Sequence, residues 1–403
     1  MRRRLLGPAL ILSAALSAAA PAAARVLTGL DVLEAGGFSQ LRGKRVGLIT
    51  NQTGVDGSGR SNVSLLSSAP GVTLAALFSP EHGFKGSAEA ARISSGRLRL
   101  SDGRAIPLYS LYGSTLAPTA RMLAGLDVLV FDIQDVGARF YTYATTMGLA
   151  LHAAERAGLP FYVLDRPNPI GGRLVEGPTL DAGLRGFIAY DDVPVRHGLT
   201  MGELAGLQGR GLRPGILRVV AMQGWRRGMW FDQTGLPWVR PSPNMPDLAS
   251  ATLYPGIGCL EFSNLSVGRG TPRPFLWIGA PWLKTRALLG ALGRRPLPGV
   301  RFRALDFTPS KPPYAGRHCR GLAIDILDRR LLRPLDVFAA LACALRDTQP
   351  RFKLRWPRTR YLVGSERFFA LYRSGAGPRA IMAYFHARAR SFQRRRRALL
   401  LYP

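Results

Sequence analysis

Residues 128–143 read VLVFDIQDVGARFYTY, and this segment carries the clearest structural signal in the chain. It opens with Val128–Phe131, a short apolar and largely β-branched run that is typical of a parallel strand buried on both faces. Polar residues follow at once, beginning with Asp132. A buried strand needs no such residues for stability, and ligands of open α/β sheets bind beyond the carboxyl ends of the strands. The segment therefore predicts a parallel sheet and a site at its edge.

Apolar runs and amphipathic segments alternate along the first half of the chain. Further strands are predicted at 45–50, 72–78 and 161–164, and helices at 62–68, 118–126 and 147–157. Alternation of this kind indicates a parallel sheet with crossover helices. We therefore predict an α/β fold whose first domain is a Rossmann-like parallel sheet.

The pattern changes after residue 192, where Pro, Gly and Trp become frequent. A strand at 322–327 and helices at 335–346 and 380–397 predict a smaller α+β C-terminal domain. Since a chain of 403 residues exceeds what one core usually supports, two domains are expected. We place the Rossmann-like catalytic domain at 25–245 and the C-terminal domain, which would complete a cleft, at 246–403.

The first 24 residues have the three parts of a secretory signal peptide. Arg2–Arg4 are basic, residues 5–20 are apolar, and Ala22–Ala24 form an A-x-A cleavage signal. We expect cleavage after Ala24 and an exported protein, periplasmic or secreted, with no stable membrane span afterwards. An uncleaved anchor is the alternative, although the alanine-rich segment is weakly apolar for one.

The chain is strongly basic, with 55 Lys and Arg against 25 Asp and Glu and a net charge of +30. A basic surface favours polyanions in general, including cell-wall glycans that carry carboxylates. The sequence has no nucleic-acid-binding motif, so no nucleic-acid partner is expected. Its three cysteines lack metal-ligand spacing, and its turn glycines do not form a dinucleotide fingerprint. We therefore expect neither a metal nor a cofactor.

Three carboxylates are the candidates for catalysis: Glu81, Asp135 and Glu261. Glycoside hydrolysis commonly uses two carboxyl groups, one protonated and one ionised. Glu81 lies in the segment Ser-Pro-Glu-His-Gly, next to apolar Phe84, where desolvation would raise its pKa toward the working pH. The structural alternative for Glu81 is a loop carboxylate that caps a helix.

Polar and aromatic residues near the predicted strand ends and in later loops are candidates for substrate binding. Arginine offers a rigid fork for a substrate carboxylate, and tyrosine a platform for a sugar ring, although core packing is as good an explanation for the rings. The candidates are His82, Gln134, Arg139, Tyr141, Tyr143, Arg166, Asn168, Arg196, His197, Asn244, Asn264 and Arg269.

Together these segments resemble the exo-β-N-acetylmuramidase family of peptidoglycan hydrolases, formerly a family of unknown function. The resemblance extends from Leu27 to Pro403. It is carried by the segments 46–54 (VGLITNQTG), 78–83 (FSPEHG), 128–143, 164–172, 195–198, 241–246 and 264–271. One departure is Val267, at a position where many relatives have Glu.

The resemblance implies an exported enzyme that removes terminal N-acetylmuramic acid from the non-reducing end of peptidoglycan fragments. It implies a site between a Rossmann-like domain and a smaller C-terminal domain, with Glu81 as the catalytic acid. The lactyl carboxylate of muramic acid would explain arginines in the site. The second catalytic group stays open between Asp135, Glu261 and the acetamido group of the substrate.

Two other functions remain as alternatives at this stage. One is a non-catalytic protein that binds muropeptides or cell-wall sugars, and the other is an ester or amide hydrolase on the same scaffold. No Gly-x-Ser-x-Gly motif supports serine-hydrolase chemistry.

Overall fold

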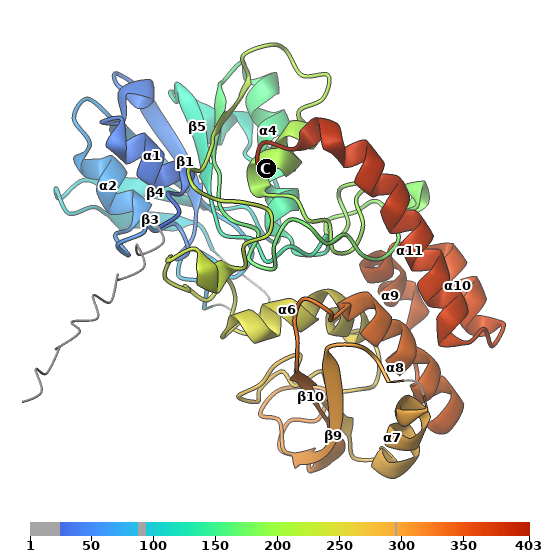
Figure 1. The fold of residues 1–403 in the computed structure, drawn as a ribbon. Helices are drawn as coiled ribbons and strands as arrows, with labels where there is room; N and C mark the ends of the chain where they lie inside the picture. The colour runs from blue at the N-terminus through green and yellow to red at the C-terminus, as the bar shows by residue number, and fades with distance from the viewer. Residues whose placement is uncertain (1–24, 88–93, 295) are drawn as a thin grey trace, which may run out of the picture.

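The larger part of the molecule is built on a mixed, mostly parallel sheet (Figure 1). The structure is a computed structural model that describes residues 25–87, 94–294 and 296–403. Within these residues the sheet has seven strands in the order β3-β4-β2-β1-β5-β6-β7. The strands are β1 (Arg45–Thr50), β2 (Thr73–Ser79), β3 (Gly96–Arg99), β4 (Ala105–Ser110), β5 (Val128–Asp132), β6 (Phe161–Leu164) and β7 (Leu217–Val220). All neighbours pair in parallel except β3, which runs antiparallel to β4 at the edge.

The central strand β5 shows why this sheet forms. Its residues alternate between two apolar layers, since successive side chains of a strand point to opposite faces. Val128 and Val130 pack with residues of the N-terminal helices, whereas Leu129 and Phe131 pack with the opposite layer. All four are buried, and a fully buried side chain of this size contributes roughly 1.5–3 kcal/mol.

Helices cover both faces of the sheet. They are α1 (Gly29–Ala35), α2 (Asn62–Ser68), α3 (Ala120–Leu123), α4 (Tyr143–Arg156) and α5 (Met201–Gln208), with 3₁₀ turns at Ser39–Leu41, Ala182–Leu184 and Phe231–Gln233. The apolar residues of α1 and α2 belong to one layer, and those of α4 and α5 to the other. The predicted α/β class with a Rossmann-like domain is therefore confirmed.

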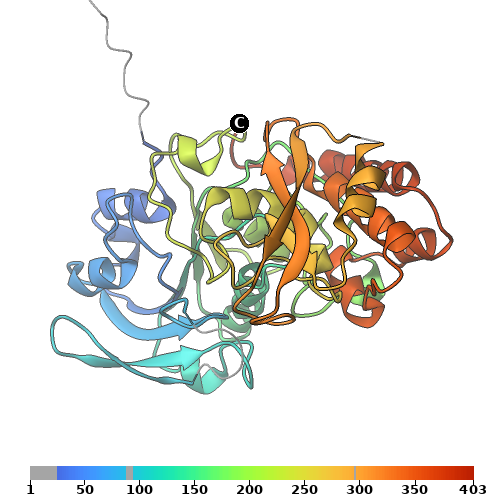
Figure 2. The ribbon, with the colours of Figure 1, turned by 90° about the horizontal axis from the view of Figure 1, so that it is seen from below.

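The smaller part contains a three-stranded antiparallel sheet and most of the remaining helices. The strands, in the order β8-β10-β9, are β8 (Trp277–Ala280), β9 (Val300–Phe307) and β10 (Cys319–Ile326). The helices are α6 (Leu248–Ile257), α7 (Thr285–Gly293), α8 (Pro334–Thr348), α9 (Trp356–Val363), α10 (Glu366–Arg373) and α11 (Pro378–Arg395), with 3₁₀ turns at Gly258–Leu260 and Arg396–Leu399. Figure 2 shows this small sheet beside the orange and red helices.

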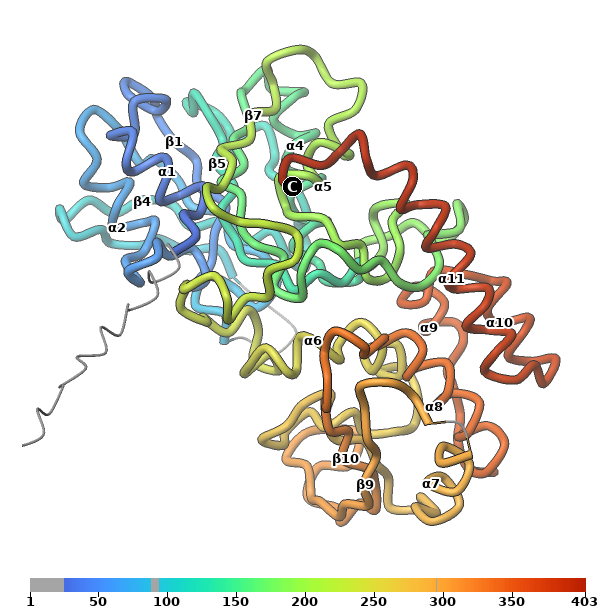
Figure 3. Tube along the Cα trace, viewed as in Figure 1, coloured from blue at the N-terminus to red at the C-terminus, as the bar shows by residue number. Residues whose placement is uncertain are grey.

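The end of the chain returns to the larger part (Figure 3). Helix α11 leads the chain back, and the Tyr402 hydroxyl donates to Asp165 Oδ2 at 2.6 Å, just after β6. The backbone N–H of Arg227 donates to the carbonyl of Pro403 at 2.9 Å. The last residues, which lie within the predicted C-terminal domain, therefore pack on the Rossmann-like sheet.

Several elements differ from the sequence-based predictions. Strands β3, β4 and β7 were not predicted. The first two lack the pattern of a buried strand, because β3 is largely exposed at the sheet edge and β4 contains Pro107. Helix α3 is shorter than predicted and is followed by Gly125 at φ 75°. Helix α4 begins at Tyr143, four residues early, because its polar first turn resembles a loop.

The predicted signal peptide, residues 1–24, lies outside the described residues. Within the described part of the chain, no helix combines the length and the apolar character that crossing a membrane requires.

Candidate active site

Glu81 lies just beyond the carboxyl end of β2, which ends at Ser79. Its Oε2 accepts a hydrogen bond of 2.6 Å from the Thr142 hydroxyl, at the start of α4. Tyr112, which follows β4, also faces Glu81. Burial raises the pKa of Tyr112 to about 12, and the charge of Glu81 and a hydrogen bond between the two side chains act in the same direction. Two segments of the larger domain, the one after β4 and the start of α4, therefore hold the Glu81 carboxylate in place.

The residue after Glu81 has an unusual backbone conformation. His82 takes φ 69°, in the left-handed region, and the following Gly83 takes φ 73°. Such a conformation costs a residue other than glycine about 1–3 kcal/mol, and strain of this kind is found most often at functional sites. His82, a candidate for substrate binding, is half-buried.

Glu261 comes from the smaller domain and directly follows the 3₁₀ turn after α6. Its Oε1 lies 2.5 Å from Nη2 of Arg269. Burial raises the pKa of Glu261, the Arg269 guanidinium opposes this effect, and the charge of Glu81 adds to it. The charge of Glu81 is the smallest of these influences on Glu261, so the two carboxylates lie within electrostatic range of one another although they belong to different domains. We call Glu81, Glu261 and Arg269 the carboxylate cluster.

Tyr254 on α6 borders the carboxylate cluster. Burial raises its pKa strongly, and the charges of Glu261 and Glu81 contribute. Its ring packs edge-on against Phe140 of the larger domain at 5.0 Å and Phe275 of the smaller domain at 4.7 Å. This aromatic contact fixes the two domains relative to one another beside the carboxylates.

Asp135, the third predicted catalytic carboxylate, is buried, with 5% of its surface exposed. Its Oδ2 accepts from the Gly137 N–H at 2.7 Å, whereas Oδ1 has no hydrogen-bond partner among the described residues. Burial raises the pKa of Asp135 to about 7.

His197 Nε2 lies 3.8 Å from Asp135 Oδ2. Burial lowers the pKa of His197 to about 3, so the ring is neutral at physiological pH. Its Nδ1 accepts from the Leu199 N–H, which places the ring proton on Nε2, facing Asp135. Because His197 carries no charge, its contact with Asp135 is not an ion pair.

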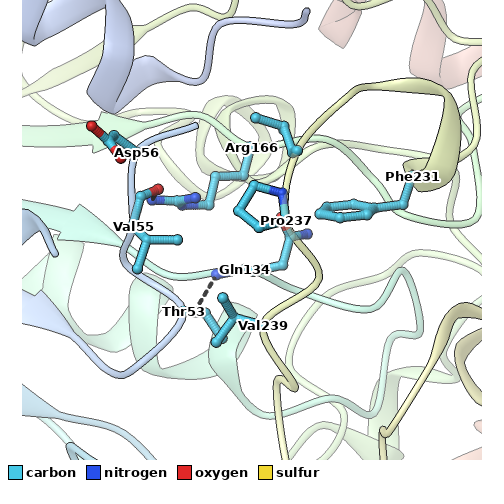
Figure 4. A pocket seen from close by; sticks show the side chains of 9 residues that line it. Thr53, Val55, Asp56, Gln134, Arg166, Phe231, Pro237 and Val239 are labelled. Atoms are coloured by element: carbon cyan, nitrogen blue, oxygen red, sulfur yellow. Dashed lines mark hydrogen bonds between the residues drawn. The ribbon is translucent and has the colours of Figure 1, made fainter. Parts of the chain in front are cut away.

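Arg166 and Gln134, both candidates for substrate binding, hold the loops at the sheet edge together. Arg166 Nε and Nη2 form a fork on Asp132 at 2.6 and 2.9 Å, and Nη2 also donates to the carbonyl of Val55. Gln134 Nε2 donates to two backbone carbonyls, and its N–H donates to the Thr53 hydroxyl (Figure 4). The pocket in Figure 4 has a free volume of about 10 Å³, which holds about one water molecule and no sugar.

The candidates Arg139 and Arg196 are also bonded to the protein. Arg139 donates from Nη1 and Nη2 to four backbone carbonyls, of which two belong to each domain. Arg196 forms a buried ion pair with Glu176 at 2.6 Å. Both guanidinium groups are buried and bonded to the protein's own oxygen atoms, so neither is placed to meet a substrate carboxylate.

The candidates Tyr141 and Tyr143 lie in the core. Both rings are buried and pack edge-on at 4.8 Å, and the Tyr143 hydroxyl donates to the carbonyl of Pro241. Asn168 is also buried, and its side-chain amide bonds to the backbone of Ile170 and Leu199.

The two remaining candidates lie in or near the smaller domain. Asn244 is half-buried in the turn before α6. The side chain of Asn264 accepts from the Lys353 N–H and donates to the carbonyl of Arg351, so it holds a loop.

The prediction from sequence missed Tyr112, Thr142 and Tyr254. Tyr112 follows the strand β4, which was itself not predicted. A search for hydroxyl groups beyond the predicted strand ends would therefore not have found Tyr112. Thr142 lies inside the segment 128–143, and Tyr254 lies just after the predicted domain boundary at 245/246, but neither is among the candidates.

No group of three or more His, Cys, Asp or Glu among the described residues is arranged to hold a metal ion. The three cysteines, Cys259, Cys319 and Cys343, are buried free thiols.

Two family models together match most of the chain. Residues 46–249 match the N-terminal model of the exo-β-N-acetylmuramidase NamZ, and residues 252–402 match its C-terminal model. The peptidoglycan β-N-acetylmuramidase NamZ of Bacillus subtilis (strain 168) is 45% identical over 327 residues, which cover 81% of this chain and 78% of that protein.

Two crystal structures of DUF1343 family proteins from Bacteroides fragilis NCTC 9343 have the same fold. The first, at 1.65 Å resolution, has a TM-score of 0.86 and 37% identity, covering 94% of this chain and 99% of that one. The second, at 1.30 Å resolution, has a TM-score of 0.74 and 27% identity, with the same coverage.

Proposed function

Because the chain belongs to the exo-β-N-acetylmuramidase NamZ family and is a glycoside hydrolase, we propose that it releases N-acetylmuramic acid from the non-reducing end of peptidoglycan fragments. The observation that supports this proposal most directly is the carboxylate cluster. It combines two carboxylates from different domains with one arginine, and glycoside hydrolysis commonly requires such a pair of carboxylates. No observation favours the non-catalytic alternative.

In this mechanism Glu81 donates its proton to the glycosidic oxygen as the bond between that oxygen and the anomeric carbon breaks. Thr142 and Tyr112 orient the Glu81 carboxyl group for this transfer. Glu261 supplies the negative charge that stabilises the oxocarbenium-like transition state. Arg269 favours the ionised form of Glu261, which is why we prefer Glu261 to Asp135 as the second group.

The proposal also assigns selectivity for muramic acid to Arg269. Its side chain is 46% exposed beside both carboxylates, so part of the guanidinium faces solvent while Nη2 contacts Glu261. Muramic acid differs from glucosamine by a lactyl ether that ends in a carboxylate. A guanidinium at this place binds that carboxylate by charge-assisted hydrogen bonds, which a glucosaminide cannot form.

We test the activity with a chromogenic β-N-acetylmuramide and the matching glucosaminide. The wild-type protein should cleave the muramide and leave the glucosaminide intact. Glu81→Gln should lower kcat at least about 10²-fold, the usual contribution of general acid catalysis, and should still bind substrate. Glu366→Gln on α10, an exposed control, should behave as wild type.

Two results would contradict the proposal in different ways. Binding of the muramide without any cleavage by the wild type would favour a sugar-binding protein. Full activity of Glu81→Gln would leave the reaction in place and remove Glu81 as the acid.

The proposal includes export, because peptidoglycan lies outside the cytoplasm and residues 1–24 have the pattern of a signal peptide. The mature protein, isolated from the periplasm or the medium, should begin at Arg25 by mass spectrometry. Recovery of the full-length chain from the cytoplasm alone would contradict export.

A further inference from the structure

A second pocket lies in the smaller domain, next to the segment that carries Glu261. It has a volume of about 600 Å³, within the range of small-molecule sites. Two aromatic and four cationic side chains line it: Trp282, Tyr314, Arg317, Arg351, Lys353 and Arg355. Of the residues that the structure describes, no acidic one contributes to its wall. We call it the basic pocket.

The aromatic wall of the basic pocket is held rigidly. Trp282 Nε1 donates to the Tyr314 hydroxyl at 2.8 Å, and that hydroxyl donates to the carbonyl of Asn264 at 2.8 Å. Arg317 lies over the Tyr314 ring, with its guanidinium carbon 5.6 Å from the ring centre. Rings held in this way lose little entropy when a ligand packs against them, which favours sugar binding.

The cations of the basic pocket differ from other arginines of the same domain. Arg301 and Arg303 both pair with Asp325, and Arg330 pairs with Asp328. Within the described residues, by contrast, no carboxylate forms an ion pair with Arg317, Arg351, Lys353 or Arg355. Four unpaired cations around one pocket create a positive potential that attracts an anion.

Asn264 connects the basic pocket to the carboxylate cluster. Its side chain holds the backbone of Arg351 and Lys353, and its carbonyl holds Tyr314. Asn264 follows Glu261 by only three residues. A glycan whose terminal sugar lies at Glu261 therefore has its next units within reach of this pocket.

We propose that the basic pocket binds a carboxylate-bearing part of the peptidoglycan fragment beyond the terminal sugar. The rings pack against the carbohydrate, and the guanidinium groups bind the carboxylate. The carboxylate belongs either to the lactyl group of a following muramic acid or to its peptide stem. This inference rests on the proposed function, because it takes the carboxylate cluster as the place of cleavage.

The test compares two double variants. The pocket variant carries Arg351→Glu and Arg355→Glu, and the control variant carries Arg286→Glu and Arg379→Glu. The control changes the net charge by the same amount, at exposed positions of α7 and α11 outside the pocket. For each protein, KM is measured on peptidoglycan fragments with peptide stems, on stem-free fragments and on the chromogenic muramide. The ratio of KM for fragments to KM for the muramide should rise about tenfold in the pocket variant, the loss of roughly one charge-assisted hydrogen bond. The control should keep the wild-type ratio.

The two fragments distinguish the sources of the carboxylate. If the KM ratio of the pocket variant rises with both fragments, the bound carboxylate is that of the lactyl group. If the ratio rises only with the stem-bearing fragment, the carboxylate is that of the peptide stem. Equal KM ratios in both variants and the wild type would overturn the inference while leaving the proposed function intact.

Direct binding keeps the inference testable if the wild type cleaves nothing and the proposed function fails. Calorimetric titration with a stem-bearing muropeptide should then show binding that the pocket variant loses and the control keeps. Binding of a single-stranded DNA oligonucleotide that displaces the muropeptide at equal concentration would instead identify a general polyanion site and overturn the inference.

Discussion

Replacing Asp135 by Asn should make the protein more stable at alkaline pH. Burial raises the pKa of this carboxyl group from 3.8 to about 7, and one of its oxygen atoms has no partner among the described residues. Asn keeps an oxygen to accept the Gly137 N–H and carries no charge. The substitution therefore removes the cost of ionising a buried group while keeping its hydrogen bond.

The sign and size of this change in the free energy of unfolding follow from proton linkage. Between about pH 4 and pH 7 the folded protein holds a proton on Asp135 that the unfolded chain has lost, so the free energy of unfolding falls as the pH rises. A pKa difference of about three units corresponds to a loss of roughly 4 kcal/mol, which is complete above pH 7. Asp135→Asn should therefore match wild type near pH 4 and exceed it by up to about 4 kcal/mol at pH 8.

The assay is urea unfolding followed by tryptophan fluorescence at pH steps from 4 to 8. Asp328→Asn serves as a reference of opposite sign, because Arg330 lowers the pKa of Asp328 to about 2 by hydrogen bonding. That variant should lose stability above pH 4 relative to wild type. Parallel pH profiles for Asp135→Asn and wild type would refute the argument from burial.

Three further substitutions test other parts of the structure. Arg139→Met should lower the free energy of unfolding, measured with urea, by at least about 3 kcal/mol, because it leaves four backbone carbonyls without a donor. The exposed control Arg379→Met should change the free energy of unfolding by less than about 0.5 kcal/mol. Arg269→Gln should raise the pKa of Glu261 and move the acidic limb of the pH–kcat/KM profile to higher pH; an unmoved limb would argue against an ionised Glu261 in catalysis. Tyr112→Phe should lower kcat about tenfold through loss of its contact with Glu81, with an unchanged circular dichroism spectrum, and unaltered kcat would remove Tyr112 from the site.

Much of the fold was predictable because strand patterns are local. The run Val128–Phe131 is apolar at every position, as a strand covered on both faces must be, and the structure has β5 there. The segments 45–50, 62–68 and 161–164 were predicted with the same bounds as β1, α2 and β6. The edge of the sheet was not predictable in this way, because exposed strands such as β3 carry no apolar pattern.

The candidate site was predictable only in part, because side chains with the same local signal have different partners. Arg139, Arg166, Arg196 and Arg269 all lie in polar loops. The first three are buried against carbonyls and carboxylates far away in the sequence, whereas Arg269 is exposed beside Glu261. No spacing along the chain distinguishes these cases.

The sequence by itself determined the α/β class, the central strands and the place of polar residues beyond them, since each depends on neighbours along the chain. Only the tertiary structure decided which of those residues meet. The contact of Glu81 with Thr142, and its approach to Glu261, join positions up to 180 residues apart. Such contacts depend on how the two domains pack, and local sequence patterns carry no record of that packing.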